Sequence, residues 1–200
     1  IDVSEIADRA AAVVQLWYPG ARGGKAAADI LFGKRSPSGK LPVTFYYQSA
    51  LEEMPAFTDY AMTNRTYRYY TGQPLYPFGY GLTYGDTQVL SVTADRQSAT
   101  VKLTNRGVDT EDVVQLYIRD MASPDATTNP KLCGFRRVFL PQGQEQEVTI
   151  PLPASAFQVC NDEGQWVNGS GRWTLYASFG QPDPRTQTLT GKTPASCIIE

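Results

Sequence analysis

Residues 172–179 read RWTLYASF, and this stretch decides the fold of the C-terminal half of the chain. Its apolar side chains, Trp173, Leu175, Ala177 and Phe179, fall on alternate positions. Because successive side chains of a β-strand point to opposite faces, this alternation predicts a strand with one buried face.

The same period of two runs through the preceding residues, from position 86 onward. Further strands are predicted at 88–94, 98–104, 112–119, 132–140 and 145–152, with a short pair near 157–160 and 165–167. Turn signals separate them: NRG at 105–107, PQG at 141–143, NDEG at 161–164 and NGSG at 168–171. Short alternating strands at this spacing predict an antiparallel β-sandwich of immunoglobulin or fibronectin III type over 86–190, followed by a tail at 191–200.

The N-terminal part of the chain follows a different pattern, in which helical and extended segments alternate. Residues 3–12 and 25–32 are rich in alanine and predict helices. The apolar runs VVQLWYP (13–19) and LPVTFYY (41–47) predict buried strands. This alternation is typical of a layered α/β sheet, but two strands make only part of one. We therefore expect 1–47 to be the C-terminal remnant of an α/β sandwich domain.

Residues 48–85 show no regular period and carry, with the strand expected before them, a concentration of aromatic side chains. These are Phe45, Tyr46, Tyr47, Phe57, Tyr60, Tyr67, Tyr69, Tyr70, Tyr76, Phe78, Tyr80 and Tyr84. Interspersed prolines and glycines exclude a long helix or strand. Because aromatic side chains bury much area, we expect an aromatic-rich, irregular interdomain strap that packs across neighbouring surfaces, a role that we favour over stacking on sugars.

The composition excludes several classes of site and partner. The 200-residue chain has 18 basic and 20 acidic residues, a net charge of −2, so nucleic acid is not an expected partner. It has no histidine, which removes Ser-His-Asp and Cys-His nucleophiles and histidine-ligated zinc. No apolar run has the roughly 18 residues of a membrane span, so no membrane partner is expected. We expect neither a metal nor a cofactor.

Cysteine usage and the first residue bear on the cellular context. Cys133, Cys160 and Cys197 are too few for a four-cysteine zinc site. A Cys160–Cys197 disulfide stays open, although buried free thiols are the simpler expectation. The chain begins at Ile1, which predicts processing or membership of a longer protein. No stretch has the basic and apolar parts of a signal peptide, and the sequence leaves both a cytoplasmic and a secreted location open.

One loop carries a pattern that suggests ligand binding. The sequence WYPGARGGKAAADIL (17–31) places glycines between an expected strand and an expected helix, as phosphate-binding loops do. Its spacing does not match a Walker A motif, because Pro19 and Ala26 stand where glycine and a serine or threonine are required. Trp17 and Tyr18 follow the expected strand, where ligand-binding loops lie in open α/β sheets. They are the candidates for substrate contact, although packing in a core is the simpler role.

Paired carboxylates are the signature of glycosidases, in which one protonates the leaving oxygen and the other attacks or activates water. The candidate carboxylates are Asp59, Asp109, Glu111, Asp112, Asp120, Asp162 and Glu163. Most of them fall at predicted turns or strand starts, and nothing in the sequence pairs two of them. We therefore predict no catalytic residue in this chain.

Three blocks of the sequence resemble the C-terminal third of glycoside hydrolase family 3, in the family's order. They are WYPGARGGKAAADILFGKRSPSGKLPVTF (17–45), RTYRYYTGQPLYPFGYGLTY (65–84), and DVVQLYI with KLCGFRRVFLPQGQEQEVTIPL (112–152). This family contains β-glucosidases, β-xylosidases and related exo-acting enzymes. The resemblance implies that 1–47 ends an α/β sandwich domain, that 48–85 connects it, and that 86–190 is a fibronectin III-like domain.

The resemblance also limits the function of this chain. In the family, the nucleophilic Asp and the acid/base Glu lie upstream of this region, and neither motif has a counterpart here. This implies the non-catalytic C-terminal portion of a retaining, exo-acting β-glycosidase that acts on β-linked glycosides without a cofactor. The chain alone is then predicted to be inactive. Its partners are expected to be the upstream catalytic domains, and self-association is another way to cover the incomplete α/β segment. A stand-alone β-sandwich that binds carbohydrate or protein is the alternative function.

Overall fold

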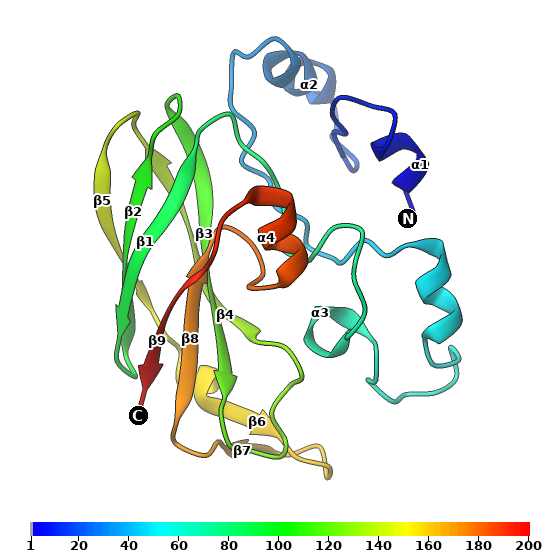
Figure 1. Ribbon diagram of the computed structural model, residues 1–200, viewed down its shortest axis with the longest axis vertical. Helices are drawn as coiled ribbons and strands as arrows, with labels where there is room; N and C mark the ends of the chain where they lie inside the picture. Colours follow the sequence, from blue (N-terminus) through cyan, green and yellow to red (C-terminus); the bar gives the residue numbers. More distant parts are fainter. Residues whose placement is uncertain (1) are drawn as a thin grey trace.

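Every alternating segment expected after residue 86 forms a β-strand in the computed structural model, which describes residues 2–200 (Figure 1). The strands are β1 Thr87–Ala94, β2 Ser98–Asn105, β3 Thr110–Asp120, β4 Lys131–Leu140, β5 Glu145–Pro151, β6 Gln158–Cys160, β7 Trp166–Asn168 and β8 Trp173–Ser178. The predicted strands are confirmed, with their ends displaced by one or two residues.

These strands build two antiparallel sheets that pack face to face. One sheet has the order β1-β2-β5 and the other the order β4-β3-β8-β9, where β9 is Ala195–Ile199, while β6 and β7 form a separate hairpin. In the first sheet Val101 lies opposite Val92 and Val148, and in the second Leu116 lies opposite Ala177. All of these side chains belong to one buried apolar cluster between the sheets. The core therefore forms on the faces that the alternation predicted.

The inner face of RWTLYASF is the best defined part of this core. Trp173 is 1% exposed, and Leu175 and Ala177 are fully buried. The ring of Trp173 meets that of Phe157 edge to face, with 5.7 Å between the ring centres. Phe179 is only half-buried, because it lies just beyond the end of β8.

Residues 191–200, expected as a tail, instead complete the second sheet, and this expectation was wrong. Strand β9 (Ala195–Ile199) pairs antiparallel with β8, and Ile199 is 3% exposed. Five residues have little strand signal of their own, and it is the free edge of β8 that makes them a strand.

A helix that the sequence analysis did not expect, α4 (Pro184–Thr190), leads into this last strand. Its start carries the usual signals, because the side chain of Asp183 accepts a hydrogen bond from the backbone of Arg185 and proline occupies the first turn. Gly191 ends it with a φ of 69°, a left-handed conformation that suits glycine. Figure 1 shows α4 lying in front of the sheets on the side of the strap.

The two helices expected near the N-terminus are present, but the first is much shorter than expected. Helix α1 (Ser4–Ala7) covers only part of 3–12, whereas α2 (Gly23–Leu31) corresponds to 25–32. No helix within residues 2–200 has the length and apolar character that crossing a bilayer requires.

Neither of the two strands expected in this segment forms, and both expectations were wrong. Every side chain of 13–19 is exposed. In 41–47 the only β-structure is an isolated antiparallel bridge between Phe45 and Tyr76. A strand needs a neighbour with which its backbone can pair, and among residues 2–200 none pairs with 13–19. This part of the molecule is therefore made of two short helices and extended chain.

The strap, residues 48–85, is irregular as expected. It contains a 3₁₀ helix, η1 (Gln48–Glu53), and one turn of α-helix, α3 (Thr66–Tyr69). Tyr67 and Phe78 are half-buried and pack against Tyr117 of the sandwich, but Phe57 and Tyr60 are almost fully exposed. The expectation that its aromatics pack is thus confirmed for one half of the strap only.

All three cysteines are free thiols, so the structure contains no Cys160–Cys197 disulfide. Cys160 is exposed, whereas Cys133 and Cys197 are half-buried. Burial raises the pKa of Cys133 to about 12, so this thiol stays protonated and unreactive at neutral pH.

Candidate functional site: the junction of strap and sandwich

The strap meets the sandwich along β3 and the loop before α4, and we call this contact the junction. Tyr67 and Phe78 of the strap stack with 4.2 Å between ring centres. Both rings lie edge to face with Tyr117 of β3, at 6.2 and 6.4 Å. Tyr117 is fully buried, and burial raises its pKa well above the usual value of 10. Its hydroxyl therefore keeps its proton and acts as a hydrogen-bond donor.

A chain of hydrogen bonds carries this contact into the strap backbone. The Tyr117 hydroxyl donates to Oε1 of Gln115 at 2.6 Å, and Nε2 of Gln115 donates to the carbonyl of Gly79 at 3.0 Å. Gly79 has a φ of 74°, and a Cβ at this position would collide with both side chains. Glycine is required here for its conformation and for its small size together.

The strap also binds the N-terminal segment directly. The backbone of Leu41 donates to the carbonyl of Tyr80 at 2.8 Å, and Gly79 donates back to the carbonyl of Leu41 at 2.8 Å. A Cβ on Gly81 would collide with the carbonyl of Gly39. Three parts of the chain thus meet within the string PLYPFGYGLTY (74–84) and its contacts.

A buried ion pair lies at the centre of the junction. Nζ of Lys40 is 2.8 Å from Oδ1 of Asp112, and the two side chains are 9% and 1% exposed. Lys40 also donates to the carbonyl of Gly81 at 2.7 Å, and Asp112 accepts hydrogen bonds from the Thr87 hydroxyl and the Val113 backbone at 2.8 Å each. Burial lowers the pKa of Lys40, an effect that the neighbouring carboxylate of Asp112 opposes. The pair links the N-terminal segment to the start of β3.

The other buried carboxylate, Asp120, lies at the opposite end of β3. It accepts hydrogen bonds from the Ser170 hydroxyl and from the backbone of Ser170, Ala122 and Ser123. Burial alone raises the pKa of Asp120, but these hydrogen bonds outweigh it, and the pKa lies below its usual value. Asp120 holds two loops together and has no free oxygen to transfer a proton.

The two buried candidate carboxylates, Asp112 and Asp120, lie too far apart to act as a glycosidase pair. Asp112 and Asp120 are eight residues apart on one strand, or roughly 26 Å at the usual rise, whereas catalytic carboxylates lie about 5–9.5 Å apart. The remaining candidates lie on the surface: Asp59, Asp109, Asp162 and Glu163 are exposed, and half-buried Glu111 pairs with Arg137. Within residues 2–200, no three carboxylate or thiol groups converge to hold a metal ion.

Trp17 and Tyr18, the two candidates for substrate contact, lie away from the junction on the N-terminal segment. Trp17 is 45% exposed and has a φ of 51°, which is unusual for a residue other than glycine. Its ring meets Phe45 edge to face at 6.3 Å between centres. Tyr18 is 99% exposed.

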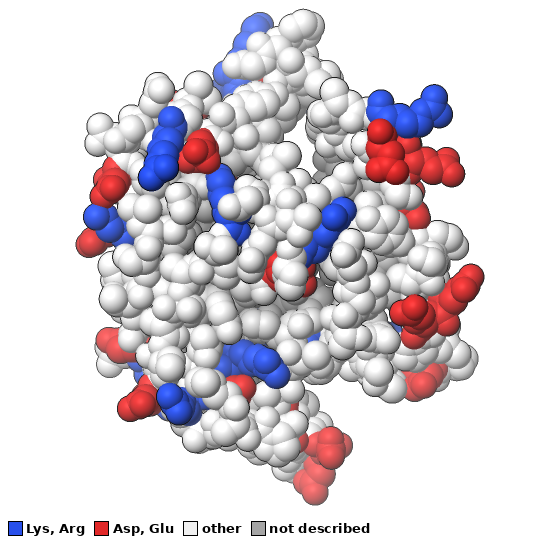
Figure 2. All heavy atoms as spheres, viewed as in Figure 1, with Lys and Arg blue, Asp and Glu red and all other residues white. Residues whose placement is uncertain are grey.

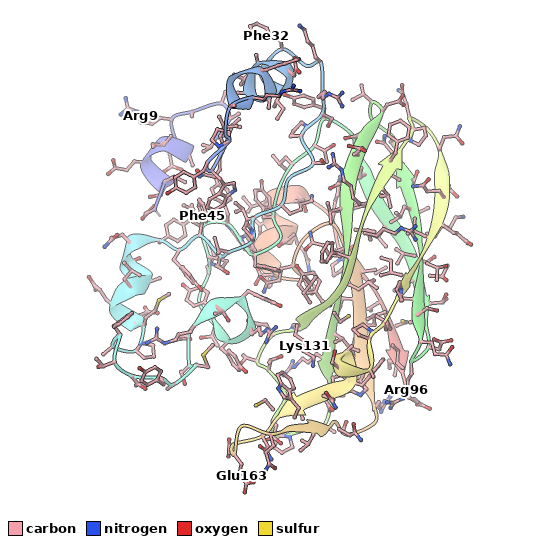
Figure 3. All side chains as sticks on the ribbon, turned by 180° about the vertical axis from the view of Figure 1, so that it is seen from behind. Arg9, Phe32, Phe45, Arg96, Lys131 and Glu163 are labelled. Atoms are coloured by element: carbon pink, nitrogen blue, oxygen red, sulfur yellow. The ribbon has the colours of Figure 1, made fainter. Side chains whose placement is uncertain are left out.

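Trp17 and Tyr18 belong to a wider surface of exposed apolar groups, which we call the apolar N-terminal surface. It consists of Val13, Val14, Leu16, Trp17, Tyr18, Leu31 and Phe32, each at least 41% exposed. Within residues 2–200, the backbone of 11–19 makes no hydrogen bond. Figure 3 shows Phe32 at the outer end of α2, and Phe45 beside the N-terminal segment. Elsewhere charges of both signs are interspersed over the face drawn in Figure 2.

The sequence analysis identified Asp112 and Asp120 only as members of a longer set, and it did not single out Lys40 or Gln115. One signal was available for the carboxylates. Both share the alternate positions of Val114, Leu116 and Ile118, which face the core, so two acids are predicted at the two ends of a buried face. For Lys40, no local signal distinguishes it from the exposed lysines around it.

Family models match two parts of this chain. One describes the "Glycosyl hydrolase family 3 C-terminal domain" and matches residues 1–84. The other describes a "Fibronectin type III-like domain" and matches residues 112–179, within the sandwich.

Similar proteins carry related names and are much longer than this chain. A xylan 1,4-β-xylosidase from Xylanibacter ruminicola is 38% identical over 187 residues, an alignment that covers 90% of this chain and 21% of the relative. A periplasmic β-glucosidase from Salmonella typhimurium is 31% identical over 189 residues, covering 84% of this chain and 24% of the relative. The chain thus spans under a quarter of the length of these two relatives.

Solved structures show the same relationship in three dimensions. The crystal structure of a GH3 β-glucosidase from Bifidobacterium adolescentis superposes with a TM-score of 0.74 at 27% identity, over 92% of this chain and 29% of the other. The family models, the relatives and this likeness agree with one another. The chain therefore belongs to glycoside hydrolase family 3, of which it represents the C-terminal part with its fibronectin type III-like domain.

Proposed function

We propose that this chain is the C-terminal, non-catalytic portion of a retaining, exo-acting β-glycosidase of the β-glucosidase or β-xylosidase type. The names of its relatives support the activity and the β-linked glycoside substrate of the whole enzyme. The state of the two buried carboxylates supports the absence of catalysis in this portion, because Asp112 and Asp120 are both occupied by hydrogen bonds and lie far apart.

The role of this portion in the enzyme is to dock on the upstream catalytic domains and stabilise them. One observation carries this proposal: residues 13–18, apolar except for Gln15, are exposed at every position and have no backbone hydrogen bond within residues 2–200. Burial of such a segment is favourable, and its free backbone can extend a sheet in a neighbouring domain. In this arrangement 1–47 completes an α/β domain, 48–85 is the connecting strap, and the sandwich from residue 86 is the outer domain.

The experiment combines this chain with the upstream portion of the parent enzyme, produced separately. Alone, the chain is expected to hydrolyse aryl β-glucosides and β-xylosides no faster than a buffer blank. The two portions together are expected to associate and to hydrolyse these substrates. Turnover by the repurified chain alone that disappears when one of its carboxylates is replaced would contradict the proposal.

A matched pair of substitutions tests which surface docks. Val13→Lys places a charge on the apolar N-terminal surface, where the valine is 43% exposed, and is expected to weaken association. Val108→Lys makes the same change at a valine of the sandwich that is 52% exposed, and is expected to leave association unchanged. Equal effects of the two substitutions would show that docking does not use 13–18.

Trp17 and Tyr18 have a second role in this proposal, which is to shape the outer part of the substrate site. The free ring of Tyr18 supports this role, because an exposed aromatic face suits the apolar face of a sugar ring. In the assembled enzyme, Tyr18→Ala is expected to raise KM for disaccharides more than for aryl monosaccharides. An equal change for both substrates would count against it.

A further inference from the structure

A cavity of about 160 Å³ lies beside the ion pair of the junction, between the strap, the start of β1, the loop after β8, and α4. The lining comes from two stretches, 80–89 and 178–194, together with Lys40 and Asp112, so the cavity exists only in the folded molecule. By comparison, a cavity of about 150 Å³ in another protein accommodates one benzene ring. The volume therefore suits one six-membered ring, and it is small beside the roughly 300–1,000 Å³ of sites for larger ligands.

The charged groups at this cavity cancel one another. Lys40 pairs with Asp112 at 2.8 Å, and Lys192, also in the lining, pairs with Asp86 at 2.9 Å. Each ammonium group also donates to one carbonyl, Lys40 to that of Gly81 and Lys192 to that of Thr87. An ammonium group has three N–H donors, so each keeps one for a further acceptor. Each ammonium group thus keeps one donor while its charge is paired with a carboxylate, Asp112 in the lining or Asp86 beside it, which favours a neutral ligand over an anion.

One polar group in the lining lacks a partner. Thr186 of α4 is 8% exposed, and its Oγ1 is buried with no hydrogen-bond partner. A buried hydroxyl without a partner is costly. Rotation of the Thr186 side chain about χ1 would turn Oγ1 toward the cavity, where a ligand can satisfy it. Gln181, which is 4% exposed, and Gln187 add side-chain amides to the lining. Amides and hydroxyls both donate and accept, as the hydroxyls of a polyol do.

Apolar groups complete the lining on other sides. Phe179, Leu189, Val89 and Pro194 contribute to it. A cavity with apolar walls and a few convergent polar groups is typical of a small-molecule site. A pyranose combines the same two features, since it has apolar C–H faces and a rim of hydroxyls.

From the size, the neutrality and the unpaired hydroxyl together, we propose that this cavity binds one neutral monosaccharide. The proposal goes beyond the function proposed above, because it assigns a ligand to this chain itself and requires no turnover. Oγ1 of Thr186 and the free N–H groups of Lys40 and Lys192 bind the sugar hydroxyls. The walls formed by Phe179 and Leu189 contact the faces of the ring.

The test is a titration of the ¹⁵N-labelled 200-residue chain with D-glucose and with D-xylose, followed by NMR. Saturable shifts are expected for the amides of Gln181, Thr186 and Lys192 with at least one of the two sugars. No saturable shift with either sugar, or shifts confined to 13–18, would overturn the proposal. Inorganic phosphate is the third probe, and binding of phosphate at these amides more tightly than either sugar would overturn the neutral-ligand assignment.

A matched pair of threonines supplies the control. Thr186→Val keeps the shape of the side chain but removes the hydroxyl, and is expected to weaken binding about fivefold. Thr188→Val makes the same change on the exposed side of α4 and is expected to leave the affinity unchanged. Equal affinities of the two variants would overturn the proposed role of Thr186.

A second variant keeps the proposal testable if Thr186→Val prevents folding. Gln187 is exposed and lines the cavity, so Gln187→Ala is compatible with the fold and is expected to weaken binding. If Thr186→Val does not fold, unchanged affinity in the Gln187→Ala variant would overturn the proposal. None of these outcomes depends on association with an upstream domain, so the function proposed above stands or fails separately.

Discussion

Residues 13–19 and 173–178 are both short apolar runs that contain a tryptophan, yet only the second is a strand. Strand β8 pairs on one side with β3 and on the other with β9, and its inner face is buried. The run 13–19 has no backbone partner within residues 2–200, and all of its side chains are exposed. The comparison shows that an apolar run needs neighbours as well as pattern, and no such neighbour of 13–19 lies among the residues described.

The largest effect expected from this difference is in amide hydrogen exchange. Amides of 13–18 are expected to exchange at nearly unprotected rates in the monomeric chain. Amides of 112–118, in the central strand β3, are expected to exchange about 10³-fold slower or more, since their opening requires unfolding of the sandwich. Sedimentation in parallel verifies the monomer. Full protection of 13–18 in a monomer would remove the contrast.

Substitution of Trp17 and of Trp173, one in each of the two runs, tests the same comparison through the free energy of unfolding. Trp173→Ala is expected to lower the free energy of unfolding by about 3–5 kcal/mol, because Trp173 is 1% exposed and lies in the core. Trp17→Ala is expected to cost less than about 1 kcal/mol, because Trp17 is 45% exposed. Chemical denaturation measures both.

A third variant tests the register of β8. Thr174 is adjacent to Trp173 on the opposite face, and Thr174→Ala is expected to cost under about 1 kcal/mol. A loss as large as that of Trp173→Ala would place the wrong face of β8 in the core.

The next largest effect is expected at the ion pair of Lys40 and Asp112, which joins the N-terminal segment to the sandwich. Lys40→Met leaves the carboxylate of Asp112 buried without its partner, which is expected to cost about 3 kcal/mol. Adding Asp112→Asn removes this charge and keeps an acceptor for Thr87, so most of the loss is expected to be regained. Additive losses in the double variant, measured by denaturation, would show that the two residues are not coupled.

A smaller effect than that of the ion pair is expected at the glycine of the junction. Gly79→Ala requires a left-handed conformation and also brings a Cβ against Gln115 and Tyr117, with an expected cost of about 2 kcal/mol. Gly143→Ala, at a φ of 70° with no atom near its Cβ, is the control, with an expected cost of about 1 kcal/mol. Equal melting temperatures for the two variants would mean that the strap does not press on β3 at this point.

Much of the sandwich could be predicted because its strands are encoded locally. Each alternates in hydrophobicity and ends at a turn rich in Gly, Asn or Pro, so strand and turn appear in one stretch of sequence. Strand β9 was missed because ASCII (195–199) alternates weakly and becomes a strand only against β8. Helix α4 was missed although Asp183, Pro184 and Gly191 mark its two ends.

The candidate site could be predicted only in part, because it joins residues that are far apart in the chain. Nothing near Lys40 in the sequence shows that its ammonium group meets Asp112, which lies 72 positions further on. The need for glycine at position 79 likewise depends on Gln115 and Tyr117. Thr186 is one of several threonines in its helix, and only the fold buries its hydroxyl without a partner beside a cavity.

The sequence by itself determined the strands of the sandwich, their inner faces, the irregular strap and, through its three motif blocks, the family. Local periodicity and turn chemistry suffice for the strands and the strap, because they act between residues close together in the chain. Only the tertiary structure decided that 13–19 stays unpaired, that β9 completes a sheet, and that Lys40 is buried with Asp112. These features depend on which distant groups come within hydrogen-bonding distance, and one segment of sequence carries no record of that.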